Sequence, residues 1–252
     1  MFFDKLKKMF SLCIPTLDRF DSFLKNNIQK YLGNEFISEI IISDENGNDI
    51  KLIQEYFPVN DKLKLFKNEK ILGPFLNKFK CCTYAKNEWI ALLDSDNFAD
   101  IDYFKISKKY ILEKNNNSIN KESIVAPCMA SPNFDYRFLN NVILTKNNIK
   151  NFYNIPMFNT FINTGNYIIN KNLIDKLKLD NDLSLIESSS ACDVKIMNTL
   201  FLEQFENLNI HIVENMIYEH CVHDNSIYLQ TYIRTHDTIN KVNDRFYRFV
   251  FN

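Results

Sequence analysis

The clearest indication of the fold is the segment at residues 89–97, Trp89-Ile-Ala-Leu-Leu-Asp94-Ser95-Asp96-Asn97. An apolar run bounded by polar residues predicts a buried strand, and a continuous rather than alternating run is typical of a parallel strand covered on both faces. Asp94 and Asp96 would then lie at the carboxyl end of the strand, where open α/β sheets bind ligands. If the backbone stays extended, residues two apart point the same way, and both carboxylates can face one divalent cation. The simpler interpretation is a loop or the cap of the next helix.

Length and charge bound the class of protein. The chain has 252 residues, of which 46% are hydrophobic, with 30 Lys and Arg against 31 Asp and Glu and a net charge of -1. This length suits one large domain or two small ones. A nucleic-acid binder usually carries a basic excess, so we expect no nucleic-acid partner.

Glycine and cysteine usage excludes two kinds of site. None of the 4 glycines belongs to a Gly-x-Gly-x-x-Gly or Gly-x-x-x-x-Gly-Lys pattern, which argues against a dinucleotide fingerprint or P-loop. The 6 cysteines lack Cys-x-x-Cys spacing and lie mostly in apolar stretches. This usage predicts buried free thiols in a reducing compartment.

The sequence shows no obvious membrane or export signal. No apolar run approaches the ~20 residues that span a bilayer. Residues 1–10 carry Asp4 and mix lysines with phenylalanines, unlike a signal peptide. We therefore expect a soluble, cytoplasmic protein without a transmembrane segment, and the sequence does not indicate its oligomeric state.

The first 130 residues alternate predicted strands and helices. Strands are expected at 11–16, 37–43, 62–66, 89–94 and 123–130, and helices at 20–32, 50–57, 73–85 and 101–113, before a polar break at 115–117. Thr16 or Asp18 would cap the first helix. This order is typical of right-handed βαβ units around a mostly parallel sheet, so the strand ends at Thr16, Asp44 and Asp94 should converge on one crevice.

The second half of the chain is less regular. We expect short antiparallel strands within 132–145, a helical segment at 146–153, and a turn at residues 163–166 before an apolar run. A helix near 173–179, a strongly amphipathic helix over 191–205, a strand at 209–213, a polar cluster at 219–224 and one long helix over 228–249 complete it. No repeat or flexible linker divides the chain.

Three segments, taken in order, resemble the successive signatures of GT-A-fold nucleotide-sugar glycosyltransferases, with family 2 the most similar. They are Ile14-Pro-Thr-Leu-Asp-Arg19, Glu39-Ile-Ile-Ile-Ser-Asp44 and Leu92-Leu-Asp-Ser-Asp-Asn97. The resemblance covers residues 11–105 and continues weakly to about 226. It implies an α/β GT-A fold: a mostly parallel central sheet flanked by helices, with a smaller antiparallel acceptor-side region. One domain would span 1–252, with a nucleotide-sugar-binding half at 11–130 and an acceptor-binding half with the C-terminal helix at 131–252.

The resemblance implies a nucleotide pocket at the first strand ends. Pro15 and Thr16 would line it, and Asp44 would accept a hydrogen bond from the base, most often uracil. Asn77 and Lys78 match a region whose polar residues meet the nucleotide or the sugar phosphate. Asp44 beside Asn-Gly could equally be only a turn residue.

The resemblance also implies a sugar and metal site. Asp94, with Ser95 beside it, would contact the ribose or sugar, and Asp96 would bind the metal. His223, or else His220, resembles a late histidine that completes the metal site in some members. A divalent cation stabilises the leaving nucleotide diphosphate, and a histidine ligand suits Mn²⁺ better than Mg²⁺. Either histidine could instead be a satisfied surface or core residue.

For the acceptor side, Asp193 resembles the acid that inverting members use as general base. The family usually shows Glu-Asp at this position, whereas Cys192 precedes the aspartate here. Asp193 could also be only a helix cap or dipole partner. The four residues Asn163, Thr164, Gly165 and Asn166 match a place that contacts the sugar or acceptor, or they form a simple turn.

These residues predict a metal-dependent transfer from a nucleotide sugar, with a UDP-sugar favoured, to a hydroxyl on a glycan, a protein or a small molecule. The alternative is an inactive glycosyltransferase-like protein that binds a glycan or partner. A haloacid-dehalogenase-like phosphatase also places Asp-x-Asp after a strand, but it wants Thr or Val two residues after the second Asp, where this chain has Phe98.

Overall fold

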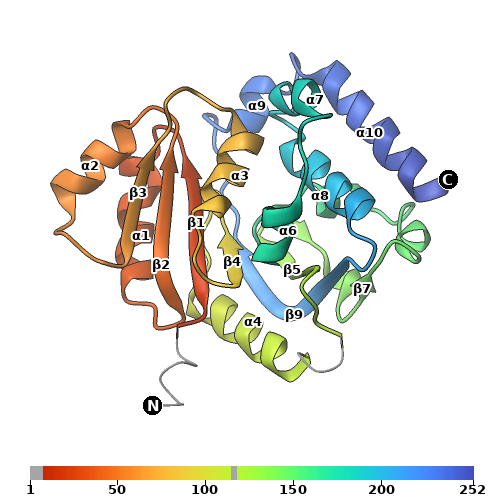
Figure 1. Ribbon diagram of the computed structural model, residues 1–252, viewed down its shortest axis with the longest axis horizontal. Coiled ribbons are helices and arrows are strands. Elements are labelled where there is room, and N and C mark those ends of the chain that lie inside the picture. Colours follow the sequence, from red (N-terminus) through yellow and green to blue (C-terminus); the bar gives the residue numbers. More distant parts are fainter. Residues whose placement is uncertain (1–7, 115–117) are drawn as a thin grey trace.

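The computed structural model describes residues 8–114 and 118–252 (Figure 1). Two segments of the sequence lie outside these residues. They are the expected polar break at 115–117 and residues 1–7, which belong to the N-terminal segment that does not resemble a signal peptide. The strands are β1 (Phe10–Thr16), β2 (Ile37–Asp44), β3 (Leu63–Lys67), β4 (Trp89–Leu92), β5 (Ser123–Ser131), β6 (Phe134–Asp135), β7 (Ile143–Leu144), β8 (Tyr167–Asn170) and β9 (Asn209–Glu219).

The helices and helical turns follow the same chain order. They are η1 (Phe20–Leu24), α1 (Lys25–Leu32), α2 (Asn48–Tyr56), α3 (Pro74–Thr83), α4 (Ile101–Lys114), η2 (Arg137–Leu139), η3 (Ile149–Asn151), α5 (Phe158–Ile162), α6 (Lys171–Lys176), α7 (Leu183–Glu187), α8 (Asp193–Gln204), α9 (Ile227–Thr231) and α10 (His236–Phe251).

The strands form a single mixed sheet of order β3-β2-β1-β4-β8-β5-β9-β7, and β6 pairs with β5. The strands β3, β2, β1 and β4 are mutually parallel, as the alternating first half of the sequence predicts. β8 then enters between β4 and β5 and runs antiparallel to both, while β9 returns parallel to β5. The expected α/β class with a smaller antiparallel region is confirmed.

The sheet carries helices on both faces, which explains its continuous apolar strands. Every residue of β1 and β4 is buried. On one face α1 meets α4 where Tyr31 contacts Phe104, and on the other α3 packs on β1 and β2 beside α6, α7 and α8 (Figure 1). Because β1, β2 and β4 run parallel, their carboxyl ends lie together along the same side of the sheet.

One local expectation for the first half is wrong. Neither Thr16 nor Asp18 caps the first helix, which begins as the π-helical turn η1. The carboxylate of Asp49, from α2, accepts the backbone N–H groups of Arg19 and Phe20, each at 2.8 Å. A cap can come from any side chain that the fold brings to the helix start, and sequence distance does not reveal it.

The second half differs more from expectation. The helix expected at 191–205 is not amphipathic. It packs against helices α3, α5 and α10 and meets β8 where Tyr167 bonds to Asn198, and residues 193–202 are all buried. The terminal helix is broken into α9 and α10, and residues 146–153 form only the short turn η3. The predicted strand at 209–213 extends to Glu219. The helix expected at 173–179 lies earlier, as α6.

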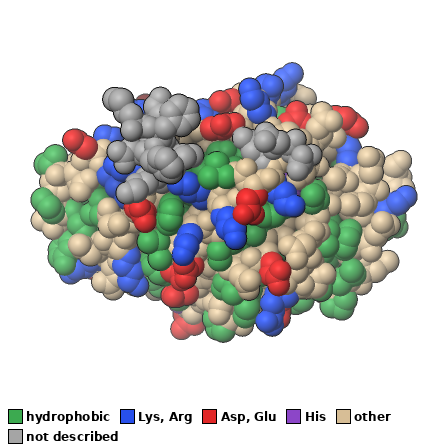
Figure 2. Space-filling view, turned by 90° about the horizontal axis from the view of Figure 1, so that it is seen from below, with side chains coloured by type: hydrophobic (Ala, Val, Ile, Leu, Met, Phe, Trp, Pro, Cys, Tyr) green, Lys and Arg blue, Asp and Glu red, His purple; other side chains and the backbone are tan. Residues whose placement is uncertain are grey.

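The cysteine and surface expectations can be checked directly. All six cysteines are free, and all except Cys221 are buried. Among the described residues, no helix combines the length and apolar character that crossing a membrane requires. On the face shown in Figure 2, basic and acidic side chains are interspersed, which agrees with a net charge of -1.

Candidate active site

The ends of β1 and β2 are tied together by short polar bonds. Pro15 and Thr16 are buried at the end of β1, and the Thr16 hydroxyl donates to Asp49 at 2.5 Å. Asp18 lies in the left-handed region, at φ 54°, and its carboxylate accepts from the side chains of Asn46 and Asn48. Those two amides lower the pKa of Asp18. These bonds join the loop after β1 to the loop after β2 at the rim of the predicted nucleotide pocket.

Asp44 ends β2 and is fully buried. Its carboxylate accepts the backbone N–H groups of Asn46 at 3.2 Å and Ile50 at 3.0 Å, so it shapes the turn into α2. These two bonds leave each oxygen with further lone pairs, and the predicted contact with a base stays a prediction.

Asn77 anchors α3 to the end of β2. Its Oδ1 accepts from the Ser43 hydroxyl at 2.7 Å and from Asn68 at 2.9 Å, and its Nδ2 donates to the Ser43 carbonyl at 3.2 Å. The side chain is buried and is engaged within the protein. This amide fixes the position of the next residue, Lys78.

Lys78 joins the two halves of the chain. Its Nζ lies 2.8 Å from Oδ1 of Asp94 and 2.7 Å from Oδ2 of Asp193. Burial by itself lowers the pKa of Lys78, but the two carboxylates raise it above its ordinary value, so the lysine is charged. Burial raises the pKa of Asp193 even though Lys78 opposes it. A carboxylate with a raised pKa is a stronger base than an exposed one.

The Asp-x-Asp segment does not stay extended as expected. β4 ends at Leu92, and the Asn97 N–H donates to the Asp94 carbonyl at 3.1 Å in a turn that buries Ser95. Asp94 and Asp96 consequently meet different partners. A turn removes the period-2 alternation on which the shared orientation rested.

Asp96 contacts the late histidine. Its Oδ2 lies 3.0 Å from Nε2 of His223, and both side chains are about one-fifth exposed, at 22% and 18%. The segment around His223 is held over the first loop, because Arg19 donates to the Asn225 carbonyl at 2.7 Å and the His223 ring lies 5.0 Å from that of Phe23.

His220 is placed differently from His223. Its Nδ1 lies 2.9 Å from Oδ1 of Asn133. Burial lowers its pKa, while the nearby carboxylates of Asp96 and Asp94 oppose that change. Among the described residues no group of three or more His, Cys, Asp or Glu side chains converges as a complete metal site.

The turn at residues 163–166 lies beside both acids. Asn166 accepts the Asp94 N–H at 2.8 Å and donates to Asp94 Oδ2 at 3.1 Å. Asn163 accepts the Lys195 N–H at 2.9 Å, at the start of α8. The Thr164 hydroxyl lies 2.7 Å from that of Tyr136.

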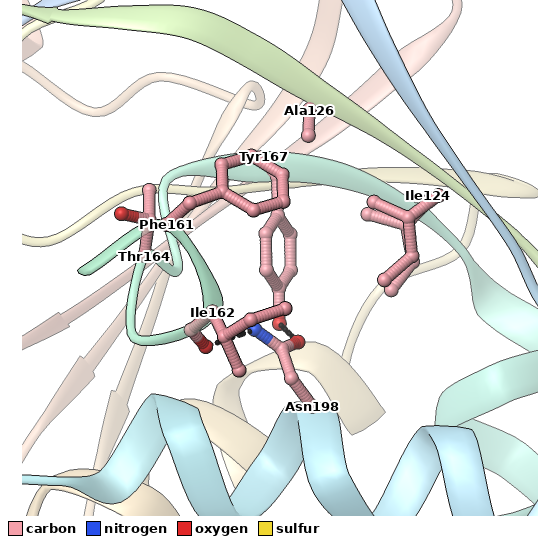
Figure 3. Close-up of a pocket in the computed structure, with 8 residues that line it drawn as sticks. Ile124, Ala126, Phe161, Ile162, Thr164, Tyr167 and Asn198 are labelled. Carbon is pink, nitrogen blue, oxygen red and sulfur yellow. Dashed lines mark hydrogen bonds between the residues drawn. The ribbon is translucent and has the colours of Figure 1, made fainter. Parts of the chain in front are cut away.

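A small cavity of about 10 Å³ is lined by Thr164, Tyr167 and Asn198, among others (Figure 3). In this view Tyr167 points toward α8, where its hydroxyl donates to Asn198, and Asn198 in turn donates to the carbonyl of Ile162. A cavity of this size has room for about one water molecule. The cavity lies among residues that pack against the 163–166 turn, and it is too small for a sugar.

Several residues of the site were not predicted from the sequence in these roles. Asp49 as the clasp of the first loop, Lys78 as the bridge to Asp193, and Tyr136 behind the 163–166 turn all depend on contacts across the fold. No local signal indicates these partners: Asp49 lies at the start of α2, but its carboxylate bonds to Arg19 and Phe20 across the fold and α2 has no side-chain cap.

Comparison with known proteins identifies the family of this chain. The model of Glycosyl transferase family 2 matches residues 11–170. No curated protein sequence matches the chain significantly. The structure is similar to that of S. aureus TarS residues 1–349 in complex with UDP-GlcNAc, with a TM-score of 0.67 and 15% identity; the match covers 94% of this chain and 66% of that one.

A second similar structure is glucosyl-3-phosphoglycerate synthase from Mycobacterium tuberculosis in complex with Mn²⁺, UDP and phosphoglyceric acid. Its TM-score is 0.59 at 11% identity, and the match covers 96% of this chain and 80% of that one. This chain thus spans slightly less than two thirds of the TarS structure. The family match over more than half of the sequence and the shared fold place the chain in glycosyl transferase family 2, with a GT-A fold.

Proposed function

We propose that the protein transfers a sugar from a nucleotide-diphosphate sugar, with a UDP-sugar favoured, to a hydroxyl acceptor, and that a divalent cation assists the transfer. The observation that carries the proposal is the contact of Lys78 with both Asp94 and Asp193, at 2.8 and 2.7 Å. It joins the Asp-x-Asp segment of the donor half to the candidate base of the acceptor half. The UDP, UDP-GlcNAc and metal in the structures of similar fold support the same class of donor.

The residues fit a metal site that the substrate completes. Asp96 and His223 offer one oxygen and one nitrogen 3.0 Å apart, close enough to bind the same ion. Mg²⁺ and similar ions are commonly held by one or two side chains together with substrate phosphates and water, and an imidazole ligand favours Mn²⁺. Because His220 bonds to Asn133, His223 is the better candidate ligand. When bound, the cation would stabilise charge on the leaving diphosphate.

The residues of the chain itself supply the rest of the chemistry. Asp193 would accept the proton of the attacking hydroxyl, and a single displacement by that hydroxyl would invert the anomeric centre. Its raised pKa suits a general base. In the complex, Lys78 can exchange a carboxylate partner for a phosphate oxygen of the donor, because a lysine is a compact point charge without a fixed bonding geometry.

Donor recognition falls to the rim of the first half. Pro15 and Thr16 would line the nucleotide pocket, and Asp44 would accept a hydrogen bond from the base. Lys78 would meet the diphosphate, while Asn77 beside it is bonded to Ser43 and Asn68. Asp94, with Ser95 in the same turn, would contact the ribose or sugar. The acceptor would approach from the 131–252 half, which carries Asp193.

A donor panel tests the proposal. Sugar conjugates of UDP, GDP, CMP and dTDP are incubated with and without Mn²⁺, and both the melting temperature and release of the free nucleotide are followed. We expect one nucleotide class to raise the melting temperature in a metal-dependent way, to be hydrolysed slowly, and to lose both effects in Asp96→Asn.

Three outcomes would change the conclusion. Absence of any nucleotide effect on folded protein would overturn the transferase assignment. Metal-dependent nucleotide binding, with no turnover in water or with any of the hydroxyl acceptors tested, would favour an inactive glycosyltransferase-like binding protein. A full effect in Asp96→Asn would move the metal site elsewhere.

A further inference from the structure

Helix α8, which begins at Asp193, lacks a cap of its own. Its preceding residue, Cys192, makes no side-chain capping bond. The first N–H groups of any helix have no partner within it, and here they cannot rely on water because Asp193, Val194 and Lys195 are 8%, 3% and 6% exposed. The Val194 N–H bonds to the carboxylate of Asp193, so it is the Lys195 N–H that needs a partner from elsewhere in the chain.

Asn163 supplies that partner from the end of α5. Its Oδ1 accepts the Lys195 N–H at 2.9 Å, and its Nδ2 donates to the Ala191 carbonyl at 3.4 Å. Lys195 is the third residue of α8, which is a position that a capping side chain normally serves. The Asn163 amide thus forms hydrogen bonds with the backbone on both sides of Asp193.

The same turn fixes the other acid. Asn166 holds the backbone and the carboxylate of Asp94. Between the two asparagines, Gly165 lies against Val194 so closely that a Cβ would come within 2.7 Å of it. The four residues 163–166 therefore set the distance between Asp94 and Asp193, whose carboxylates share Lys78.

We propose that Asn163 is a positioning residue for the transfer reaction: it acts as a remote cap of α8 that places the Asp193 carboxylate, rather than as a direct contact to sugar or acceptor. The inference rests on the proposed function. It predicts that loss of the cap moves Asp193 away from the acceptor hydroxyl while leaving the donor pocket intact.

Two substitutions separate capping from substrate contact. Asn163→Ala removes both bonds. Asn163→Asp loses only the donor to the Ala191 carbonyl, keeps an oxygen for the Lys195 N–H, and adds charge that a helix start favours. Asn159→Ala is the matched control, because Asn159 also bonds from α5 to Lys195, but at its Nζ (3.0 Å) and not at the backbone.

The measurement is kcat, donor KM and the pH profile of nucleotide release and transfer, with the best donor of the panel. A misplacement near 1 Å can cost about 100-fold in rate, so we expect Asn163→Ala to lower kcat about 10- to 100-fold with KM within about 3-fold. Asn163→Asp should stay within about 5-fold of wild type, and Asn159→Ala within about 2-fold. The acid limb of the pH profile should move in Asn163→Ala. In Asn163→Asp it should move to higher pH, because an added carboxylate beside Asp193 raises the pKa of that group, and in Asn159→Ala it should stay in place.

The outcomes discriminate cleanly. Unchanged kcat in Asn163→Ala, an equal loss in Asn163→Asp, or a rise in KM at constant kcat would each overturn the positioning role. If Asn163→Ala does not fold, the Asp variant decides alone: folded protein with about 100-fold lower kcat overturns the inference, and near-wild-type kcat supports it. A wild type without any nucleotide-sugar turnover would overturn the proposed function, and this inference with it.

Discussion

Replacing Gly165 with alanine tests how closely the 163–166 turn packs against α8. A Cβ built at Gly165 would lie 2.7 Å from Cγ2 of Val194 and 3.2 Å from Cγ1, whereas ordinary contact begins at 3.4 Å. The gap must therefore widen by 3.4 − 2.7 = 0.7 Å. Gly165 does not have the positive φ that strains an alanine, so the expected cost is purely steric.

The size of the effect follows from packing. Adding a methyl group to a filled core costs about 1–3 kcal/mol, and for a domain of this size each kcal/mol lowers the melting temperature by about 2–4 °C. Because Val194 follows Asp193 directly, a shift of α8 also moves the candidate base. We expect kcat to fall about 10-fold or more, since displacements near 1 Å reach about 100-fold.

Urea unfolding of a double-mutant cycle checks this reasoning. Val194→Ala removes both clashing methyl groups, so Gly165→Ala should cost about 1–2 kcal/mol less in that background. Gly33→Ala is the matched control, because its Cβ would meet only the Lys30 carbonyl at an ordinary 3.6 Å. Additive costs, within about 0.5 kcal/mol, would refute the contact with Val194 as the cause.

Buried charges give further measurable outcomes. Lys78→Met should lower the free energy of unfolding by about 3–5 kcal/mol at pH 7, because two carboxylates lose their counter-charge. Burial raises the pKa of Asp193, so this carboxylate takes up a proton more readily in the folded protein than in the unfolded chain. The destabilisation measured by urea unfolding should therefore shrink from pH 7 to pH 5. A cost independent of pH would contradict this. Burial lowers the pKa of Lys195 from 10.5 to about 8, so between pH 8 and 10.5 the unfolded chain binds this proton more tightly than the folded protein. The free energy of unfolding should therefore rise with pH in that range, by up to about 3 kcal/mol. Lys195→Met should lack this rise, and the same slope of unfolding free energy against pH in wild type and variant would refute the prediction. Mn²⁺ alone should leave the melting temperature unchanged, whereas Mn²⁺ with UDP should raise it, because Asp96 and His223 alone offer too few ligands; a full shift with metal alone would argue for a preformed site.

The local sequence determined the parallel half of the fold. β1, β2 and β4 are covered on both faces, so burial is recorded in the sequence as uninterrupted apolar runs. The chain can connect parallel neighbours only through a crossover, and the intervening helical segments supplied it. For the same reason the apolar runs alone locate Asp44 at the end of one strand and Asp94 just beyond the end of another.

Tertiary structure alone decided the rest of the site. Nothing in the run at Tyr167–Asn170 indicates that β8 enters between β4 and β5, because side-chain period does not name a pairing partner. The bonds from Lys78 to Asp193 and from Asn163 to Lys195 likewise join residues far apart in the chain. Uninterrupted apolar runs in the local sequence indicate buried strands, but a buried charge or a helix start is satisfied by whichever partner the packed fold brings within about 3 Å.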